Sequence, residues 1–444
     1  MSATTSNPPV KAHANPRLEV PRDVIKRCVH CGLCLDFCPT YRLLGNELDS
    51  PRGRIYQIRA FSEGRIAADD PRFRLHMYRC LDCRACETAC PSGVDYGRLI
   101  EAARAEIRAT EMGEKVTRQV VLGGIFTSNA ALDAAGTATR VYQKSGLQKV
   151  VRGSGLLKIL PGPFKKLGEM ESMLPDLPGG FIAARLPEHV IPTDGAPTHR
   201  VAFISGCIAA RFFDTTNEAT LRVLARNGCE IIVPRGQKCC GALHVHAGER
   251  DRARQLARHN IVEFERTGAS VYIINAAGCG STLKEYGELL DDDPIWRERA
   301  HEFAGRIRDI NEFIAAIGPR GPLGRIDRVV TYQDACHLAH GQKIREQPRA
   351  LIKAIPGIKL VEMRESDFCC GSAGIYNITQ PEMANQLLEL KMDAIVETGA
   401  DAVIAPNPGC IIQIAAGIRK RGLTMDVIHP IDLLDQAYRI AEGS

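Results

Sequence analysis

Eight cysteines near the amino terminus constrain this chain more than any other feature. They form two copies of one spacing, Cys28-Val-His-Cys31-Gly-Leu-Cys34-Leu-Asp-Phe-Cys38-Pro39 and Cys80-Leu-Asp-Cys83-Arg-Ala-Cys86-Glu-Thr-Ala-Cys90-Pro91. Three thiols at two-residue spacing can surround one part of a metal centre, and a fourth thiol after a longer spacer can reach a second centre. The chain has 17 cysteines in all, an odd number that disulfides alone explain poorly.

This repeated C-x2-C-x2-C-x3-C-P spacing is typical of bacterial ferredoxins with two [4Fe–4S] clusters, in which the fourth cysteine of each run binds the other cluster. We therefore expect two [4Fe–4S] clusters with crossed pairing, one held by Cys28, Cys31, Cys34 and Cys90, the other by Cys80, Cys83, Cys86 and Cys38. Structural zinc is the alternative, but zinc needs neither the proline nor two identical copies. A pair of such clusters serves to pass single electrons.

The remaining nine cysteines lie between residues 207 and 410, and eight of them form two matching sets. Each set has one cysteine, then a Cys-Cys-Gly turn, then a last cysteine: Cys207, Cys239, Cys240 and Cys279, followed by Cys336, Cys369, Cys370 and Cys410. Matching cysteines are 129, 130 or 131 residues apart, which indicates an internal repeat. Cys229 has no counterpart and is predicted to be a buried apolar thiol.

Short β-rich runs alternate with amphipathic stretches through this repeat, a pattern typical of βα units around a mainly parallel sheet. The predicted strands are 201–205, 230–233, 270–275, 329–332, 359–362 and 402–405, and the clearest predicted helices are 217–227, 253–267 and 381–398. Each repeat cysteine therefore follows a strand, at the sheet edge where ligands usually bind. Four thiols at one edge suffice for a metal centre or an active dithiol; a purely structural turn, or a metal-free docking surface for partner subunits, is the alternative.

The expected fold class is α+β followed by α/β: a twin-cluster ferredoxin-like helical module, then two tandem Cys-Cys-Gly α/β repeats with mainly parallel sheets. The expected domains are a disordered tail (1–21), a two-[4Fe–4S] ferredoxin-type domain (22–98), a helical segment with a proline-rich linker (99–198), and repeat domains at 199–318 and 325–442. Lys158, Lys165 and Lys166 are predicted to form a solvated basic face, with docking of an acidic partner as the alternative.

Composition and missing motifs exclude several functions. A net charge of +5 is too small to argue for a nucleic-acid partner, and no apolar stretch approaches the roughly 18 residues of a membrane span. The chain has neither G-x-G-x-x-G after a strand nor G-x-x-x-x-G-K-[ST], so we expect no flavin, nicotinamide or nucleoside triphosphate of its own. Four histidines near the repeat cysteines are candidate ligands or proton relays, although loop histidines that bind nothing are the simpler interpretation: His244, His246, His337 and His340.

Taken together, these motifs resemble the iron–sulfur subunit of glycolate oxidase (glycolate dehydrogenase). The wider family includes heterodisulfide reductase catalytic subunits, one of the subunits of anaerobic glycerol-3-phosphate dehydrogenase, and lactate-utilisation proteins. The resemblance rests on CVHCGLCLDFCPTYRLLGNELDSPRGRIYQIR, RCLDCRACETACPSGVDYG, NAAGCGSTLKEYG and FCCGSAGIYNIT, and covers roughly residues 22–100 and 199–436.

The resemblance implies an electron-transfer subunit that carries no flavin. In that family, FAD belongs to partner subunits that oxidise glycolate to glyoxylate, and the iron–sulfur subunit passes their electrons to a respiratory-chain acceptor, for which we expect a quinone. Heterodisulfide reductases have a fifth cysteine in each repeat, which completes a noncubane [4Fe–4S] cluster. Here Ala276 and Asn407 take that place, which argues against disulfide reduction and leaves four-thiolate clusters as additional sites.

Three hypotheses follow. The first is an electron-transfer subunit of a glycolate oxidase, inactive on glycolate by itself and with no assigned catalytic residue. The second keeps the architecture but serves lactate, glycerol-3-phosphate or another 2-hydroxy acid. The third is a thiol-disulfide reductase acting at the Cys-Cys-Gly turns. The expected location is the cytoplasm, with peripheral association at the cytoplasmic face of the inner membrane as an open alternative.

Overall fold

The computed structural model describes residues 22–107, 112–154, 168, 170–177, 180–181, 183 and 185–443. The predicted tail (1–21) and the predicted basic face (Lys158, Lys165 and Lys166) lie outside the described residues. The chain forms two compact units. The first comprises Met1–Lys115 with Val245–Gly248, and the second comprises Val116–His244 with Glu249–Ser444.

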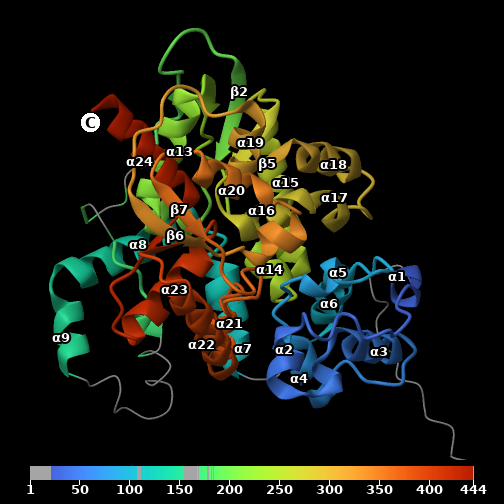
Figure 1. The fold of residues 1–444 in the computed structure, drawn as a ribbon. Coiled ribbons are helices and arrows are strands. Elements are labelled where there is room, and N and C mark those ends of the chain that lie inside the picture. The colour runs from blue at the N-terminus through green and yellow to red at the C-terminus, as the bar shows by residue number, and fades with distance from the viewer. Residues whose placement is uncertain are drawn as a thin grey trace, which may run out of the picture. The chain divides into compact units, whose positions relative to one another are not determined.

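The first unit is helical. Its helices are α1 (Arg22–Lys26), α2 (Pro39–Leu44), the 3-10 helix η1 (Glu47–Asp49), α3 (Pro51–Ser62), α4 (Pro71–Arg79), α5 (Ala85–Thr88) and α6 (Tyr96–Glu106), drawn in blue in Figure 1. Prolines at the first helical position and capping side chains explain where α3 and α4 begin, because Ser50 accepts from the Gly53 amide and Asp70 accepts from the amides of Arg72 and Phe73. The apolar core of this unit runs from Val24 to Ile107 and so includes α6.

The second unit opens with helices and continues with two sheets. After α7 (Met112–Val116), which crosses the boundary between the units, come the π-helix η2 (Thr117–Ile125), α8 (Asn129–Lys144) and α9 (Leu147–Ser154). The first sheet has the order β1-β3-β2-β4-β5, from strands β1 (His189–Val190), β2 (His199–Ile204), β3 (Cys229–Ile232), β4 (Val271–Ile274) and β5 (Ile307–Asp309). Strands β1 and β3 pair antiparallel, whereas β3, β2, β4 and β5 pair in parallel.

The second sheet repeats the topology of the first, with the order β7-β6-β8-β9. Its strands are β6 (Arg328–Tyr332), β7 (Ile358–Val361), β8 (Ala402–Ile404) and β9 (Asp426–Ile428), all parallel. Without β1, the first sheet matches it strand for strand. The predicted fold class is therefore confirmed, and all six predicted strands are present within two residues of their predicted ends. The sequence pattern missed β1, β5 and β9, because two or three residues are too few to show alternation.

Helices cover the two sheets. In the first repeat they are α12 (Ala209–Phe212), α13 (Asp214–Arg226), α14 (Ala242–His246), α15 (Arg250–Glu265), α16 (Ala277–Lys284), α17 (Tyr286–Leu289), α18 (Arg297–Arg306) and α19 (Ile310–Ile317). In the second they are the π-helix η3 (His337–Gly341), α20 (Glu346–Lys353), α21 (Tyr376–Thr379), α22 (Pro381–Glu397), α23 (Pro408–Lys420) and α24 (Pro430–Glu442). The helices predicted at 217–227, 253–267 and 381–398 correspond to α13, α15 and α22.

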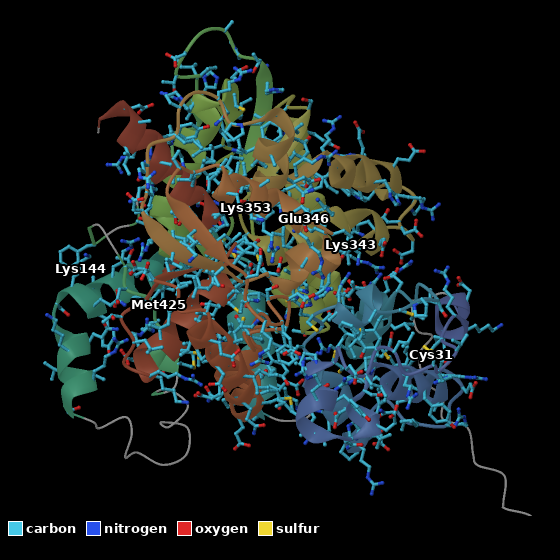
Figure 2. The ribbon with its side chains drawn as sticks, in the orientation of Figure 1. Cys31, Lys144, Lys343, Glu346, Lys353 and Met425 are labelled. Atoms are coloured by element: carbon cyan, nitrogen blue, oxygen red, sulfur yellow. The ribbon has the colours of Figure 1, made fainter. Side chains whose placement is uncertain are left out.

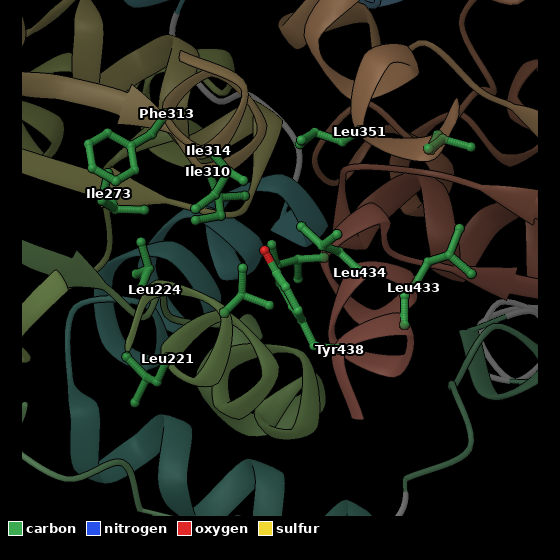
Figure 3. Packing of buried hydrophobic residues seen from close by; sticks show 14 of the residues in the cluster. Leu221, Leu224, Ile273, Ile310, Phe313, Ile314, Leu351, Leu433, Leu434 and Tyr438 are labelled. Atoms are coloured by element: carbon green, nitrogen blue, oxygen red, sulfur yellow. The ribbon is translucent and has the colours of Figure 1, made fainter. Parts of the chain in front are cut away.

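The two repeats share one apolar core. Leu221 and Leu224 of α13 pack in the same cluster as Leu434 and Tyr438 of α24, and Figure 3 shows side chains from both repeats facing one another there. Cys229 is fully buried in this cluster, as predicted for an apolar thiol. The shared core holds the two sheets at a defined distance, and with them the cysteines at their edges.

No helix among the described residues combines the length and the apolarity that crossing a lipid bilayer requires.

Candidate functional sites

Two cavities in the first unit are lined by cysteines. Cys28, Cys31, Cys34 and Cys90 line the first cavity together with Cys86. Cys38, Cys80, Cys83 and Cys86 line the second. The fourth cysteine of each motif thus lies beside the first three of the other motif. Four thiols around a cavity are the donor set of a [4Fe–4S] cluster, so the residues present fit that cofactor.

Left-handed backbone at matching positions shapes both cysteine loops. His30 and Asp82 have φ values of 56° and 54°, and Gly32 and Arg84 have values of 89° and 61°. A Cβ atom at Gly32 would lie 2.8 Å from Nη1 of Arg52, the end of a flexible side chain, so glycine there avoids both a strained conformation and a displacement of that guanidinium. Arg84 adopts the same conformation despite its side chain, a strained arrangement.

The cysteines of the first cavity are more exposed than those of the second. Cys31, labelled in Figure 2, is exposed, and Cys28, Cys34 and Cys90 are partly buried. The four thiols assigned to the second cavity are all buried: Cys38, Cys80, Cys83 and Cys86. Burial raises the pKa of Cys34 to about 11 and raises the pKa of Cys86 well above its usual range, so these thiolates require a nearby cation such as cluster iron to form at neutral pH.

Hydrogen bonds reach two sulfur atoms of the second cavity. The hydroxyl of Tyr96 donates to Cys80 Sγ at 3.6 Å, and the backbone amide of Asp82 lies 3.3 Å from the same sulfur. Cys38 Sγ lies 3.3 Å from the Thr40 hydroxyl. Hydrogen bonds to ligand sulfurs are among the factors that set a cluster's reduction potential.

A fully buried guanidinium fixes the loop around Cys38. Arg54 donates to the hydroxyl of Thr40 at 3.0 Å, to the carboxylate of Asp49 at 3.3 Å and to the carbonyl of His76 at 2.7 Å. Asp49 is itself buried and also binds the His76 ring at 2.9 Å. Because the Arg54 guanidinium is paired with the Asp49 carboxylate and its other N–H groups are bound, it positions Cys38 without needing solvent. Sequence reasoning missed these residues, since their long-range partners cannot be read from spacing.

A second ionic network surrounds the Cys80 loop. Nδ1 of His246 donates to the carboxylate of Asp82 at 3.0 Å and lies 3.7 Å from that of Glu101. Burial opposes the ionisation of Asp82, but the hydrogen bond from His246 and the charge of Arg84 outweigh it and lower the pKa of this carboxyl. Asp82, Glu101 and His246 have the spacing of metal ligands; Arg84, which donates to Glu101 at 3.1 Å, already supplies a positive charge there.

The four repeat cysteines of the first set converge. Cys207 follows β2, Cys239 and Cys240 follow β3, and Cys279 lies in α16 after β4. Cys207 Sγ lies 3.5 Å from Cys239 Sγ, and further thiol hydrogen bonds link Cys239 to Cys240 and Cys240 to Cys279. The hydrogen bond that Cys207 donates to Cys239, together with burial, raises the pKa of Cys207.

The second set converges in the same way. Hydrogen bonds link Cys369 to Cys336 and to Cys370, and Cys370 to Cys410. Cys370 accepts from Cys369 and Cys410, and these bonds lower its pKa. Asn407 donates to Cys410 Sγ at 3.6 Å while its side-chain oxygen accepts from the Gly278 amide at 3.1 Å. Asn407 therefore connects the second set to α16, which carries Cys279 of the first.

The four candidate histidines contact other groups. His244 is buried and donates to the Leu122 carbonyl at 2.9 Å, His246 binds Asp82, and His340 lies 3.1 Å from the Arg345 guanidinium. Burial lowers the pKa of both His244 and His340. The ring of His337 lies against Gly278, since a Cβ there would be 3.7 Å from Nδ1. These contacts favour structural roles for His244 and His340.

Family comparisons cover most of the chain. The sequence model described as "4Fe-4S dicluster domain" matches residues 24–94, and "Cysteine-rich domain" matches 201–284 and 330–415. The segment between them matches "Glycolate oxidase iron-sulfur subunit, linker region" at 113–174. The dicluster domain and the two repeat domains thus follow the order that the cysteine spacing predicts.

Two full-length relatives decide the family. The chain is 42% identical over 418 residues to "Probable glycolate oxidase iron-sulfur subunit" of Bacillus subtilis, covering 92% of this chain and 93% of the relative. It is 31% identical over 423 residues to "Glycolate oxidase iron-sulfur subunit" of Escherichia coli, covering 93% and 94%. The chain belongs to the glycolate oxidase iron–sulfur subunit family. The resemblance that the motifs alone indicate is therefore confirmed.

Part of the glycolate oxidase iron–sulfur subunit architecture is shared more widely. One of the subunits of fumarate reductase (CoM/CoB) from Methanothermobacter marburgensis is 35% identical over 243 residues, which cover 54% of this chain and 47% of that protein. Membership of the family makes this chain a subunit of an oxidoreductase with iron–sulfur clusters.

Proposed function

We propose that the chain is the electron-transfer subunit of a glycolate-oxidising complex. It would accept electrons from flavin-binding partner subunits that oxidise glycolate to glyoxylate, and deliver them to a respiratory-chain quinone. The observation that supports the proposal best is the pair of cysteine-lined cavities in a chain of this family. The proposed location is the cytoplasm, at the cytoplasmic face of the membrane that contains the quinone.

The eight amino-terminal cysteines would hold the two clusters in crossed pairing. Each cluster, when bound, supplies a one-electron carrier. Cys28, Cys31, Cys34 and Cys90 would hold the more exposed cluster, and Cys80, Cys83, Cys86 and Cys38 the buried one. The grouping of these thiols around two cavities supports that pairing.

The electron count of the proposed reaction is balanced by the partners. Oxidation of glycolate to glyoxylate releases two electrons and two protons at the partner's flavin. The chain passes the electrons one at a time, and a quinone takes up two electrons and two protons to become a quinol. The chain itself needs no substrate pocket, so substrate choice between glycolate, lactate and other 2-hydroxy acids belongs to the flavin subunits.

The proposal is tested by substrate-dependent reduction. The chain is reconstituted anaerobically, mixed with the flavin subunits expressed from the same organism, and supplied with glycolate, lactate or glycerol 3-phosphate. Bleaching of the cluster absorbance and a reduced-cluster EPR signal are expected with glycolate only, and none without the flavin subunits. Reduction by glycolate in the isolated chain would refute the proposal, and reduction by lactate alone would move it to another 2-hydroxy acid.

The pairing is tested by single substitutions. We expect Cys38→Ser to weaken the EPR signal of the buried cluster, which Cys80, Cys83 and Cys86 would also hold. We expect Cys90→Ser to weaken the EPR signal of the exposed cluster. Cys229→Ala is the control, because this thiol lies in the apolar core of the other unit. Damage confined to each variant's own motif would show that the pairing is not crossed.

The two sets of repeat thiols are proposed as further cluster sites. Their convergence through thiol hydrogen bonds supports this use. Iron above eight atoms per chain, with protection of the repeat thiols from alkylation, is the expected result. Eight iron atoms and freely alkylated repeat thiols would favour a metal-free docking surface.

A further inference from the structure

Lys391 is a buried lysine beside the second Cys-Cys-Gly turn. It lies in α22 and is 1% exposed. Its ammonium group donates to the carbonyls of Glu365 at 2.8 Å and Ser366 at 3.2 Å, in the loop that leads to Cys369. These contacts tie the helix to the loop that carries the two adjacent thiols.

The internal repeat supplies a matched comparison. Gly241 packs against Ala253 of α15, and Gly371 packs against Ala384 of α22. With these helices aligned, the position of Lys391 corresponds to Asn260. Asn260 is 3% exposed, and its side-chain nitrogen donates to the carbonyls of Cys239 at 3.1 Å and Lys238 at 3.4 Å. Asn260 thus binds backbone carbonyls at the first residue of a Cys-Cys-Gly turn and just before it, and Lys391 binds backbone carbonyls a few residues before the second turn. They differ in charge, because Asn260 is neutral and Lys391 is a cation.

The charge of Lys391 has no carboxylate partner among the described residues. Its contacts are two carbonyl oxygens and, at 3.8 Å, the sulfur of Met363. The nearby carboxylate of Asp367 is bound by the Arg345 guanidinium at 3.0 Å. Carbonyl dipoles solvate an ammonium but do not neutralise it, and a buried net charge is costly unless an opposite charge lies close by. Four buried or partly buried thiols lie at this site, and a metal held by four thiolates carries net negative charge.

The first repeat has basic side chains where solvent reaches them. Arg211 and Lys238 line a cavity of about 550 Å³ that also reaches Cys207. Arg211 is paired with Asp133 at 2.9 Å. Water and this carboxylate screen the positive charge there, whereas Lys391 is sealed from water.

We propose that Lys391 is the buried counter-ion of an anionic metal–thiolate centre on Cys336, Cys369, Cys370 and Cys410. The first set of repeat thiols, which has Asn260 at that position, holds such a centre less tightly. This inference rests on the proposed electron-transfer function, to which it assigns a third redox centre and its site.

The decisive comparison is between Lys391→Met and Asn260→Met in the full-length, anaerobically reconstituted protein. Both substitutions remove hydrogen bonds from a buried side chain to backbone carbonyls, but only the first removes a charge. For the wild type we expect metal beyond the eight iron atoms of the amino-terminal clusters and slow alkylation of Cys410. Lys391→Met should lose that additional metal to a chelator at least about tenfold faster and should expose Cys410 to alkylation. Asn260→Met should retain the metal on the second set of repeat thiols. Lys391→Arg keeps the positive charge and should lose this metal as slowly as the wild type.

Controls separate this result from misfolding and from failure of the proposed function. Cys229 is fully buried in the core of the same unit, so its resistance to alkylation reports that each variant is folded. Glycolate-dependent reduction of the amino-terminal clusters is measured in the wild type with the flavin subunits; its absence there would refute the electron-transfer proposal alone. Equal metal loss in both methionine variants, unchanged retention in Lys391→Met, or a wild type without additional metal would overturn the counter-ion role.

Discussion

Tyr96 illustrates how a single residue can distinguish the two amino-terminal cluster sites. Its ring is buried, and its hydroxyl donates to Cys80 Sγ at 3.6 Å. A hydrogen bond to a ligand sulfur stabilises the more negative, reduced state of a cluster, so it raises the reduction potential. Tyr96 lies six residues beyond Cys90 and belongs to neither cysteine motif, so the spacing of the cysteines does not single it out.

We expect Tyr96→Phe to lower the reduction potential of the buried cluster by about 60 mV, a tenfold change in a one-electron equilibrium. The ring stays in place, so the change isolates the hydrogen bond. An EPR-monitored redox titration measures it. Tyr56→Phe, on an exposed ring of α3 that is 54% accessible, should change neither cluster. Equal shifts of both clusters with Tyr96→Phe would contradict the assignment.

At the scale of elements, helix α24 depends on a neutral histidine. His429 caps the helix, with Nδ1 accepting from the Ile431 amide at 3.2 Å and Nε2 donating to the Asn275 carbonyl at 2.9 Å. Burial lowers the pKa of this imidazole to about 4. Since an unfolded histidine has a pKa near 6.5, the unfolded chain binds the proton first as the pH falls below that value.

The contribution of His429 to stability is therefore complete above about pH 6.5 and is lost as the pH falls toward 4. We expect it to decrease by about 2 kcal/mol between pH 7 and pH 5. His429→Asn keeps a capping oxygen but does not titrate, so the variant should lose less stability over this range. Urea unfolding followed by the single tryptophan, Trp296, measures the difference. Parallel pH profiles would contradict the prediction.

The two cysteine loops are elements of opposite exposure. The 28–34 loop contains the exposed Cys31, whereas the thiols of the 80–86 loop are buried. We expect ferricyanide to destroy the cluster of the exposed loop first, because the oxidant reaches its sulfurs directly. The order of loss of the two EPR signals measures this, with the Tyr96→Phe shift identifying the buried cluster. Loss of both signals at one rate would contradict it.

At the scale of the whole molecule, the amino-terminal unit is completed by a distant segment. Residues Val245–Gly248 belong to it, and within it His246 binds the buried carboxylate of Asp82 at 3.0 Å. Arg104 also donates to the His246 carbonyl at 3.0 Å. The loop between Cys80 and Cys83 is therefore held in part by a residue 164 positions away in the sequence.

His246→Ala should leave a buried carboxylate without its histidine partner, at a cost of about 1–3 kcal/mol. We expect the cluster on Cys80, Cys83, Cys86 and Cys38 to be lost at a lower temperature in this variant. The absorbance of the cluster during heating measures that temperature. His301→Ala is the matched control, because that histidine lies 3.7 Å from Asp291 with both side chains more than half exposed, where such pairs contribute little. An unchanged cluster in His246→Ala would show that Asp82 needs no such partner.

Local spacing determined much of this protein. The twin C-x2-C-x2-C-x3-C-P runs, the Cys-Cys-Gly repeat and the alternation of strands and helices were sufficient to predict the dicluster domain, the duplicated parallel sheets and the family. They suffice because cluster ligands, tight turns and βα units each depend on residues close together in the sequence. The short strands β1, β5 and β9 left no such local signal.

Only the tertiary structure decided which residues surround the thiols. Arg54, Tyr96, His246 and Lys391 act through partners that folding brings to them, and no spacing rule relates those partners. The difference between Asn260 and Lys391 shows this most directly. Both occupy the same position in a repeated fold. The effect of the Lys391 charge nevertheless depends on which carboxylates, carbonyls and thiols folding places around it, because electrostatic energy depends on distance and burial rather than on sequence order.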